Sequence, residues 1–243
     1  MTDILPHFKR ILLKLSGEAL MGGQSFGIDP TVLESVASEI SDVHKLGVEV
    51  GIVIGGGNIF RGLQSDAFGV ERVAGDHMGM LATLINAIAL GEVLKGIGHD
   101  SRVMSALDIS KVAEPYDRGK ALTYLANKCI VIFGAGTGNP YFTTDTAATL
   151  RALEINAEVL MKATNVDGVY DADPKLDPSA RPFSDLTYDE VLKRNLKVMD
   201  LTAVSLAMGQ RLPIIVFNLG KTGNIIKAVS GDKVGTLITG DKS

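Results

Sequence analysis

The sequence of 243 residues is poor in the residues that cross-link or stiffen a small protein, with one cysteine, no tryptophan and eight prolines. The single cysteine, Cys129, excludes a disulfide within the chain, and its apolar surroundings from Lys128 to Phe133 predict a buried, unreactive thiol. Aromatic residues make up only 5% of the chain, so aliphatic side chains must build the core, as in parallel sheets that are covered on both faces. A chain of this length buries such a core without covalent staples.

The balance of charge and the lack of long apolar segments exclude further classes of protein. With 24 Lys and Arg against 28 Asp and Glu, the chain has a net charge of −4, which argues against general electrostatic binding to nucleic acid or to an anionic membrane. This balance does not exclude a local basic pocket that binds a phosphate. The N-terminus lacks the apolar segment of a signal peptide. The longest apolar run, Met78 to Gly91, is too short to cross a bilayer. We therefore expect a buried helix there and a cytoplasmic protein.

Strand and helix patterns alternate along the chain. Strands are expected in short apolar runs at residues 10–15, 48–54, 101–104, 129–133, 158–163, 214–217 and 236–239. Helices are expected from Asp29-Pro30 to Gly47 and at residues 70–95, 120–127, 144–155, 187–194 and 201–211. The Pro- and Asp-rich segment Val169 to Asp185 predicts a hairpin or a long surface loop. Without a linker or repeat, the pattern predicts one domain over residues 1–243, a three-layer α/β sandwich on a mostly parallel sheet.

Two glycine-containing segments look like nucleotide-binding motifs but do not match them. Gly220-Lys221-Thr222 ends like a P-loop, but the first glycine of that motif would fall at position 215, which is Ile. The segment Gly134 to Gly138 follows a strand, but position 139, where a dinucleotide fingerprint has its third glycine, is Asn. We expect a solvated turn at the first segment and do not expect a dehydrogenase.

Three glycine-rich segments do stand at the ends of expected strands: Lys14 to Gly17, Gly55 to Asn58 and Gly134 to Asn139. Glycine lets backbone N–H groups approach phosphate oxygens closely, and such loops form anion sites. Because ligands of an open α/β sheet bind at the carboxyl ends of its strands, three such loops predict a substrate that carries several phosphates.

Charged side chains accompany these loops. Lys14 lies at the end of an apolar strand, where an ammonium is costly unless it meets an anion; a solvated strand end is the alternative. Arg61 follows the second loop and could bind a phosphate with its guanidinium fork. Asp76 and Asp145 stand near expected helix starts, so each is either a helix cap or a ligand contact.

Four strings occur in a characteristic order: KLSGE at 14–18, GGGNIFRG at 55–62, TGNPYFTTD at 137–145 and KATNVDGVY at 162–170. Together they resemble the bacterial UMP kinases (uridylate kinases) of the amino-acid kinase family, over almost the whole chain. The resemblance implies ATP-dependent phosphorylation of UMP to UDP in pyrimidine nucleotide biosynthesis, with Mg²⁺ brought by ATP and without a direct protein ligand for the metal. It also implies a homohexamer that UTP inhibits and, in some members, GTP activates.

The resemblance further implies roles for individual residues. ATP would be bound by Lys14, Leu15, Ser16, Gly17, Gly57, Arg61, Thr164, Asn165, Tyr170 and Asp173. UMP would be bound by Gly56, Asp76, Thr137, Gly138, Asn139, Pro140, Tyr141, Phe142, Thr143 and Thr144. Lys14, Arg61 and Asp145 would be catalytic, with Asp145 organising the lysine and the Mg²⁺ region. GTP would act through Gly22, Gly23, Gln24, Ser25, Phe26 and Gly27. The acceptor side then lies mainly within residues 50–145 and the ATP side within 160–220.

The sequence departs from the family pattern at two places. Members usually have Ala-Gly-Gly where this chain has Gly134-Ala135-Gly136, and a positive φ at Ala135 would cost roughly 1 kcal/mol or more. Asp117 and Gly119 dilute a basic cluster that many members carry, which would weaken effector or interface contacts.

The chemistry of the implied reaction agrees with the residues at hand. A phosphate monoester has a second pKa of ~6 and is mostly dianionic at neutral pH, so the acceptor needs alignment and charge neutralisation rather than a general base. We therefore expect no catalytic histidine. An amino-acid or carbamate kinase of the same fold is one alternative, which the segment Thr137 to Thr144 disfavours. A nucleotide-sensing regulator without turnover is another, and the presence of Lys14, Arg61 and Asp145 argues against it.

Overall fold

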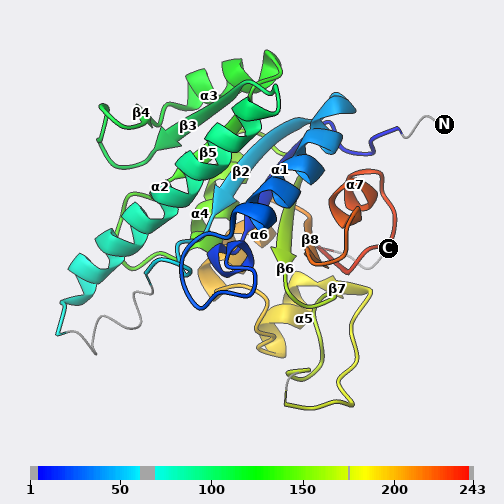
Figure 1. The fold of residues 1–243 in the computed structure, drawn as a ribbon. Helices are drawn as coiled ribbons and strands as arrows, with labels where there is room; N and C mark the ends of the chain where they lie inside the picture. The colour runs from blue at the N-terminus through cyan, green and yellow to red at the C-terminus, as the bar shows by residue number, and fades with distance from the viewer. Residues whose placement is uncertain (1–4, 61–68, 175, 241–243) are drawn as a thin grey trace.

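A computed structural model describes residues 5–60, 69–174 and 176–240 (Figure 1). They contain a sheet of nine strands in the order β4-β3-β5-β2-β1-β6-β8-β9-β7. The strands are β1 (Arg10–Leu15), β2 (Glu49–Ile54), β3 (Ser101–Ser105), β4 (Glu114–Pro115), β5 (Ile130–Gly134), β6 (Val159–Thr164), β7 (Asp185–Thr187), β8 (Ile214–Asn218) and β9 (Thr236–Thr239). The pairing of β8 with β9 is antiparallel and the other pairings in this sheet are parallel, which confirms the mostly parallel sheet.

Helices cover both faces of the sheet (Figure 1). One face carries α1 (Pro30–Lys45), α2 (Arg72–Gly96) and α7 (Asn224–Val229), and the other carries α3 (Arg118–Ala126), α4 (Thr144–Glu154), α5 (Tyr188–Lys193) and α6 (Leu201–Gly209). Each face has its own hydrophobic cluster, since alternate side chains of a strand point to opposite faces. In β1, for example, Leu13 packs under the first group of helices and Leu12 under the second. The three-layer α/β sandwich is thus confirmed.

The helix starts are set by local capping. Asp29 precedes Pro30 and accepts hydrogen bonds from the backbone N–H groups of Thr31 and Val32 at 2.9 and 3.3 Å, as the sequence predicts for α1. Helix α2 starts at Arg72 after Glu71, so the reading of Asp76 as its cap is wrong.

Helix α4 is capped by the side chain of Thr143, which accepts from the backbone N–H groups of Asp145 and Thr146 at 3.1 and 3.2 Å. The reading of Asp145 as the cap is therefore also wrong. With the backbone groups served by Thr143, the Asp145 carboxylate is left to interact with other side chains.

Helix α2 is buried on one face only. Leu84, Ala87 and Leu90 are enclosed against the sheet, whereas Met78, Leu81 and Ile85 are 41%, 46% and 51% exposed. By length and composition α2 could cross a membrane, but half of its apolar window is buried in the fold. The prediction of a buried helix thus holds for one side and fails for the other, which carries an exposed apolar stripe.

Several short elements escape prediction. Strands β4 and β7 have two and three residues and α7 has six, too few to show a period. The segment between β6 and β7 leaves the sheet as a long loop, which we call the excursion after β6. Tyr170 and Pro182 form an antiparallel bridge within it, so the predicted hairpin or surface loop is confirmed. Cys129 is buried, and burial raises the pKa of its thiol to about 11, in accord with an unreactive side chain.

The strand order places a crevice at the centre of the sheet. The chain continues from β1 to β2 on one side, while β6 lies on the other side of β1. Such a switch point opens a crevice at the carboxyl ends of the strands, where loops diverge to opposite faces. The loops that leave β1, β2, β5 and β6 all begin at this edge, because these strands are parallel.

Candidate active site

Two lysines stand side by side at the switch point. Lys14 of β1 and Lys162 of β6 are register partners on adjacent strands, and both share the face of Leu12 and Leu160, which is covered by α4. The ammonium of Lys14 lies 2.9 Å from Oδ1 of Asp145, and that of Lys162 lies 2.7 Å from Oδ2. Lys162 also donates to the carbonyl of Val198. Lys14 therefore meets an anion, as predicted, and the alternative of a solvated strand end is wrong.

This triad is nearly closed to solvent, with side-chain exposures of 11% for Lys14, 12% for Lys162 and 15% for Asp145. Burial alone would raise the pKa of Asp145, but the two ammonium groups outweigh it and hold that pKa below its usual value. Burial and the neighbouring Lys14 ammonium lower the pKa of Lys162, against the pull of Asp145. Two cations and one anion leave a net positive charge that suits a bound phosphate.

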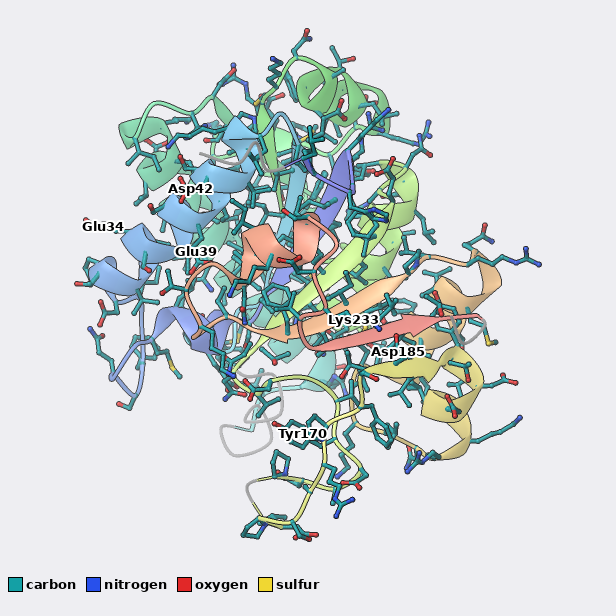
Figure 2. All side chains as sticks on the ribbon, turned by 90° about the vertical axis from the view of Figure 1, so that its right-hand side faces the viewer. Glu34, Glu39, Asp42, Tyr170, Asp185 and Lys233 are labelled. Atoms are coloured by element: carbon teal, nitrogen blue, oxygen red, sulfur yellow. The ribbon has the colours of Figure 1, made fainter. Side chains whose placement is uncertain are left out.

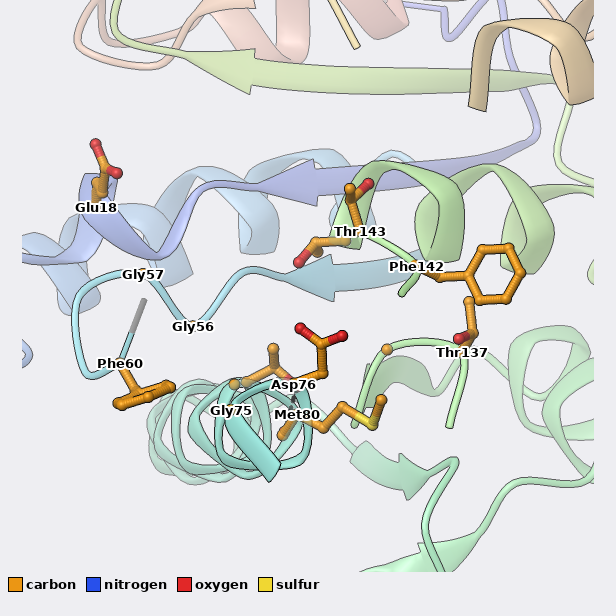
Figure 3. Close-up of a pocket in the computed structure, with 14 residues that line it drawn as sticks. Glu18, Gly56, Gly57, Phe60, Gly75, Asp76, Met80, Thr137, Phe142 and Thr143 are labelled. Carbon is orange, nitrogen blue, oxygen red and sulfur yellow. Dashed lines mark hydrogen bonds between the residues drawn. The ribbon is translucent and has the colours of Figure 1, made fainter. Parts of the chain in front are cut away.

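A cavity of about 350 Å³ opens between α2, the loop after β2 and the loop after β5 (Figure 3). Six residues predicted to bind UMP line it: Gly56, Asp76, Thr137, Phe142, Thr143 and Thr144. Gly57, predicted to bind ATP, lies on the same wall. In Figure 3, Asp76 points its carboxylate into the space between the Gly56–Gly57 loop and Thr143. Gly138, Asn139, Pro140 and Tyr141 belong to the same loop but are not on the lining.

Asp76 joins the two walls of this cavity. It accepts from the backbone N–H of Tyr141 at 2.7 Å and from Nε of Arg72 at 2.9 Å. The same guanidinium lies 5.3 Å from the centre of the Tyr141 ring, within cation–π range. Tyr141 has a φ of 71°, a costly conformation for a residue with a side chain, and these contacts hold it there.

The loop after β5 has the strained geometry that its sequence suggests. Ala135 has a φ of 62°, which confirms the conditional prediction of strain at this position. Its N–H donates to Oγ1 of Thr83 on α2 at 2.8 Å, so α2 also fixes this loop. Gly138 has a φ of 79° and packs on the backbone of Ala106, where a Cβ would lie 2.8 Å from the carbonyl oxygen.

A second cavity, of about 670 Å³, lies between α1 and the loops that follow β6 and β8. Thr164 and Asn165, both predicted to bind ATP, line it, and so does Gly22 from the predicted effector loop. Gly220 and Thr222 lie on the same wall. The turn that contains them is exposed, as predicted, but it borders a cavity. Glu18 lines both cavities, so they adjoin at the 3₁₀ helix η1 (Gly17–Leu20).

Other predicted residues lie away from the cavity linings. Tyr170 and Asp173 belong to the excursion after β6, and Figure 2 shows Tyr170 there, well separated from Glu39 on α1. Leu15, Ser16 and Gly17 form the end of β1 and the start of η1 next to Lys14. Arg61 lies outside the described residues.

Sequence reasoning missed two residues of the site. Lys162 is an ammonium in an otherwise apolar strand, which is the signal that singled out Lys14 and could have found it. Asp200 caps α6 through the N–H of Ala203 and accepts from the hydroxyls of Thr143 and Thr146, which ties the start of α4 to α6. A capping aspartate has no sequence signal for such distant contacts.

Comparisons with known proteins agree with this geometry. The profile of the amino acid kinase family matches residues 9–218. A uridylate kinase from Stutzerimonas stutzeri (strain A1501) is 56% identical over 233 residues, which cover 96% of this chain and 94% of that protein.

Solved structures give the same result for the fold. UMP kinase from Bacillus anthracis superposes with a TM-score of 0.94 at 43% identity, covering 97% of both chains. UMP kinase from Ureaplasma parvum superposes with a TM-score of 0.90 at 36% identity, covering 95% of this chain and 98% of the other. With the family profile over most of its length and relatives that match almost end to end, the chain belongs to the amino acid kinase family.

Proposed function

We propose that this chain transfers the γ-phosphoryl group of ATP to the phosphate of UMP. The observation that carries the proposal is the Lys14–Asp145–Lys162 triad at the switch point of a sheet whose carboxyl edge borders two adjoining cavities. A phosphate oxygen of UMP attacks the γ-phosphorus, the bond from that phosphorus to the β,γ-bridging oxygen breaks, and UDP and ADP result. The similarity to uridylate kinases and UMP kinases supports UMP as the acceptor.

The residues of the triad do the electrostatic part of this reaction. Donor and acceptor are both anions, and the transition state spreads negative charge over the transferring group. Lys14 and Lys162 present two ammonium groups to it from fixed positions, because Asp145 holds both. The UMP phosphate is mostly dianionic at neutral pH, with a second pKa of ~6, so no side chain has to remove a proton.

The residues of this site fit a Mg²⁺ ion that is bound mainly by the phosphates of ATP. Each oxygen of Asp145 is paired with an ammonium group, but the buried Oδ1 receives no hydrogen bond within the described residues. That oxygen would accept from a water of the hydrated ion, while phosphate oxygens would supply the direct ligands. When bound, the ion would neutralise charge on the β- and γ-phosphates. The residues of this chain align the two nucleotides and keep the triad closed to solvent.

The two cavities divide between the two nucleotides. UMP takes the cavity lined by Gly56, Asp76 and Thr143, within the range 50–145, and ATP takes the one lined by Thr164 and Asn165. The ATP side also draws on η1 and α1, beyond the range 160–220. In this proposal residues 1–243 act as one domain.

Assembly and regulation form a further part of the proposal: a cytoplasmic homohexamer, inhibited by UTP and activated by GTP. The exposed stripe of Met78, Leu81 and Ile85 on α2 supports assembly, because contiguous apolar surface of this kind marks contact sites. UTP carries the uracil and ribose of UMP, and its additional phosphates would extend toward the ATP side, so competition with UMP is expected.

The test is ADP release, followed with a coupled assay, for UMP, CMP, AMP and GMP and for acetylglutamate, glutamate and carbamate. We expect turnover with UMP and a strong preference over CMP, since cytosine offers an acceptor where uracil offers N3–H and would leave a buried group unpaired. Turnover with an amino acid or carbamate instead would establish the alternative kinase. Binding of UMP without turnover would establish a nucleotide sensor.

A further inference from the structure

Two buried asparagines pair with each other beneath the loop after β2. Asn58, which follows the three glycines of that loop, and Asn86, on α2, are 2% and 0% exposed. Nδ2 of Asn58 donates to Oδ1 of Asn86 at 3.0 Å, and Nδ2 of Asn86 donates to Oδ1 of Asn58 at 2.7 Å. The two amides thus form a closed ring of two hydrogen bonds, which we call the amide bridge.

The second N–H of each amide extends the bridge to the backbone. Asn58 donates to the carbonyl of Gly27 at 2.9 Å, and Asn86 donates to the carbonyl of Gly55 at 2.7 Å. The N–H of Gly27 returns a hydrogen bond of 2.8 Å to the carbonyl of Asn58. All four side-chain N–H groups therefore have acceptors. Turning either amide over would set donor against donor and acceptor against acceptor, so the bridge has one arrangement.

Two neighbouring glycines, Gly17 and Gly56, allow the backbone to pack closely around the amide bridge. A Cβ on Gly17 would lie 2.5 Å from both Oδ1 of Asn58 and the carbonyl oxygen of Gly55. A Cβ on Gly56 would lie 2.8 Å from the Cβ of Ala82 on α2. The loops that leave β1 and β2 are thus packed directly on each other, on α2 and on the bridge.

We propose that the amide bridge is the positioning element of the loop after β2: Asn86 fixes Gly55, and with it the backbone of Gly56 and Gly57, which line the acceptor cavity. The inference rests on the proposed function for the identity of the acceptor, UMP. Neither asparagine lines that cavity. Their effect passes through the backbone, and they are positioning residues.

Only a primary amide of this length makes these contacts at both positions. A carboxylate at position 86 has the same shape but loses both N–H groups, which leaves the carbonyl of Gly55 and Oδ1 of Asn58 without donors. Buried acceptors without donors carry a full desolvation cost, so the loop is expected to move away from α2. An aliphatic residue at position 86 would remove the bridge without adding charge.

The experiment compares Asn86→Asp, Asn86→Ala and Asn58→Asp with the unchanged chain. Steady-state kinetics with UMP and ATP gives KM and kcat, thermal unfolding gives stability, and amide hydrogen exchange followed by mass spectrometry gives the mobility of residues 55–60. Ser101→Ala is the control, because Ser101 is also buried and donates to the carbonyl of Gly91, farther along α2. The control loses a buried hydrogen bond to the same helix.

We expect the KM for UMP to rise about tenfold or more in the Asn86 variants, because the Gly55 carbonyl and Oδ1 of Asn58 both lose their donor, with faster exchange over residues 55–60. The control is expected to lose stability with KM and that exchange unchanged. Variants that lose only stability, in step with Ser101→Ala, would overturn the positioning role. If the unchanged chain does not release ADP with UMP, the proposed function fails, while hydrogen exchange still decides whether the bridge holds the loop.

Discussion

Lys14 and Lys162 are direct neighbours on adjacent strands, and one carboxylate, that of Asp145, receives both of their ammonium groups. Two like charges at neighbouring register positions repel each other, and burial strengthens that repulsion. The arrangement is stable because Asp145 stands at the start of α4, directly over the two strands. It keeps two cations ready for an anionic transition state without a rearrangement during the reaction.

Replacing Lys14 by alanine tests the first of these cations. Its charge is needed most when the transferring phosphoryl group carries the most negative charge, so kcat should fall about a hundredfold to a thousandfold. UMP binding should stay nearly intact, because the acceptor cavity is lined by other residues. Steady-state kinetics with each substrate varied in turn provides the measurement. A variant with a raised KM for ATP and an unchanged kcat would contradict the assigned role.

Replacing Asp145 by asparagine tests the balance of charge within the triad. Burial and Lys14 lower the pKa of Lys162, and the Asp145 carboxylate opposes them. Without that carboxylate the pKa of Lys162 falls further, so Lys162 loses its proton at a lower pH than in the unchanged chain. The alkaline limb of kcat should therefore move to lower pH, by about one unit or more.

A profile of kcat against pH over the neutral and alkaline range measures the shift. Asp189→Asn is the matched control, because Asp189 is an exposed carboxylate paired with Lys193 at 3.4 Å. An alkaline limb that moves equally in both variants would contradict the charge balance proposed for the triad.

Much of the site could be predicted because its residues stand at strand ends. The glycine-rich segments after β1, β2 and β5 meet at one edge, which follows from parallel strands alone. The contact of Asp76 with Tyr141 could not be predicted, since it joins residues 65 positions apart and depends on how α2 packs. The same holds for the pairing of Asn58 with Asn86. Strand β7 and helix α7 were missed because tertiary contacts, and not periodicity, define elements so short.

A pair of histidines predicts how stability depends on pH. Nδ1 of His44 lies 3.0 Å from Nδ1 of His99, whose Nε2 lies 2.6 Å from the hydroxyl of Ser41. Burial lowers the pKa of both rings, and the proximity of His99 lowers that of His44 further. A hydrogen bond with the backbone of Lys128 raises the pKa of His44, and the charge of Lys128 lowers it by less. The charge of Lys45 lowers the pKa of His99, and that of Asp42 raises it.

The sign of the dependence follows from these shifts. With folded-state pKa values below about 6.5, the folded chain binds fewer protons than the unfolded chain, so the free energy of unfolding decreases as pH falls below that value. Urea unfolding at several pH values from about 7.5 to 5.5 measures it. His99→Gln should flatten this dependence and His77→Gln should leave it in place. A dependence that His99→Gln leaves unchanged would assign it to other groups.

The exposed stripe on α2 predicts how the chain assembles. Leu81→Glu or Ile85→Glu places a charge in an apolar surface that a subunit contact would desolvate, so each should convert the proposed hexamer into smaller species. Sedimentation velocity measures the change. Leu176→Glu serves as the control, because Leu176 is an apolar side chain with 83% exposure in the excursion after β6. A hexamer that survives both α2 changes would place the subunit contacts on another face.

The loop of residues 22–27 predicts the response to GTP. Gly22 and Gly27 have φ values of 57° and 89°, and a Cβ on Gly22 would lie 2.6 Å from a carboxylate oxygen of Asp29. Replacing the whole loop would therefore disturb the start of α1 and, through Gly27, the amide bridge. Changing Gly23, Gln24 and Phe26 to serine while keeping Gly22 and Gly27 alters the loop alone.

In that variant we expect basal activity to remain and activation by GTP to be lost, because an effector that orders this loop is coupled to the active site by about 1–3 kcal/mol. Titration of GTP at a fixed, subsaturating concentration of UMP measures the activation, and reciprocity requires UMP to tighten GTP binding by the same factor. The unchanged chain, titrated in the same way, is the reference. Activation that persists at the same GTP concentration would place the effector site outside this loop.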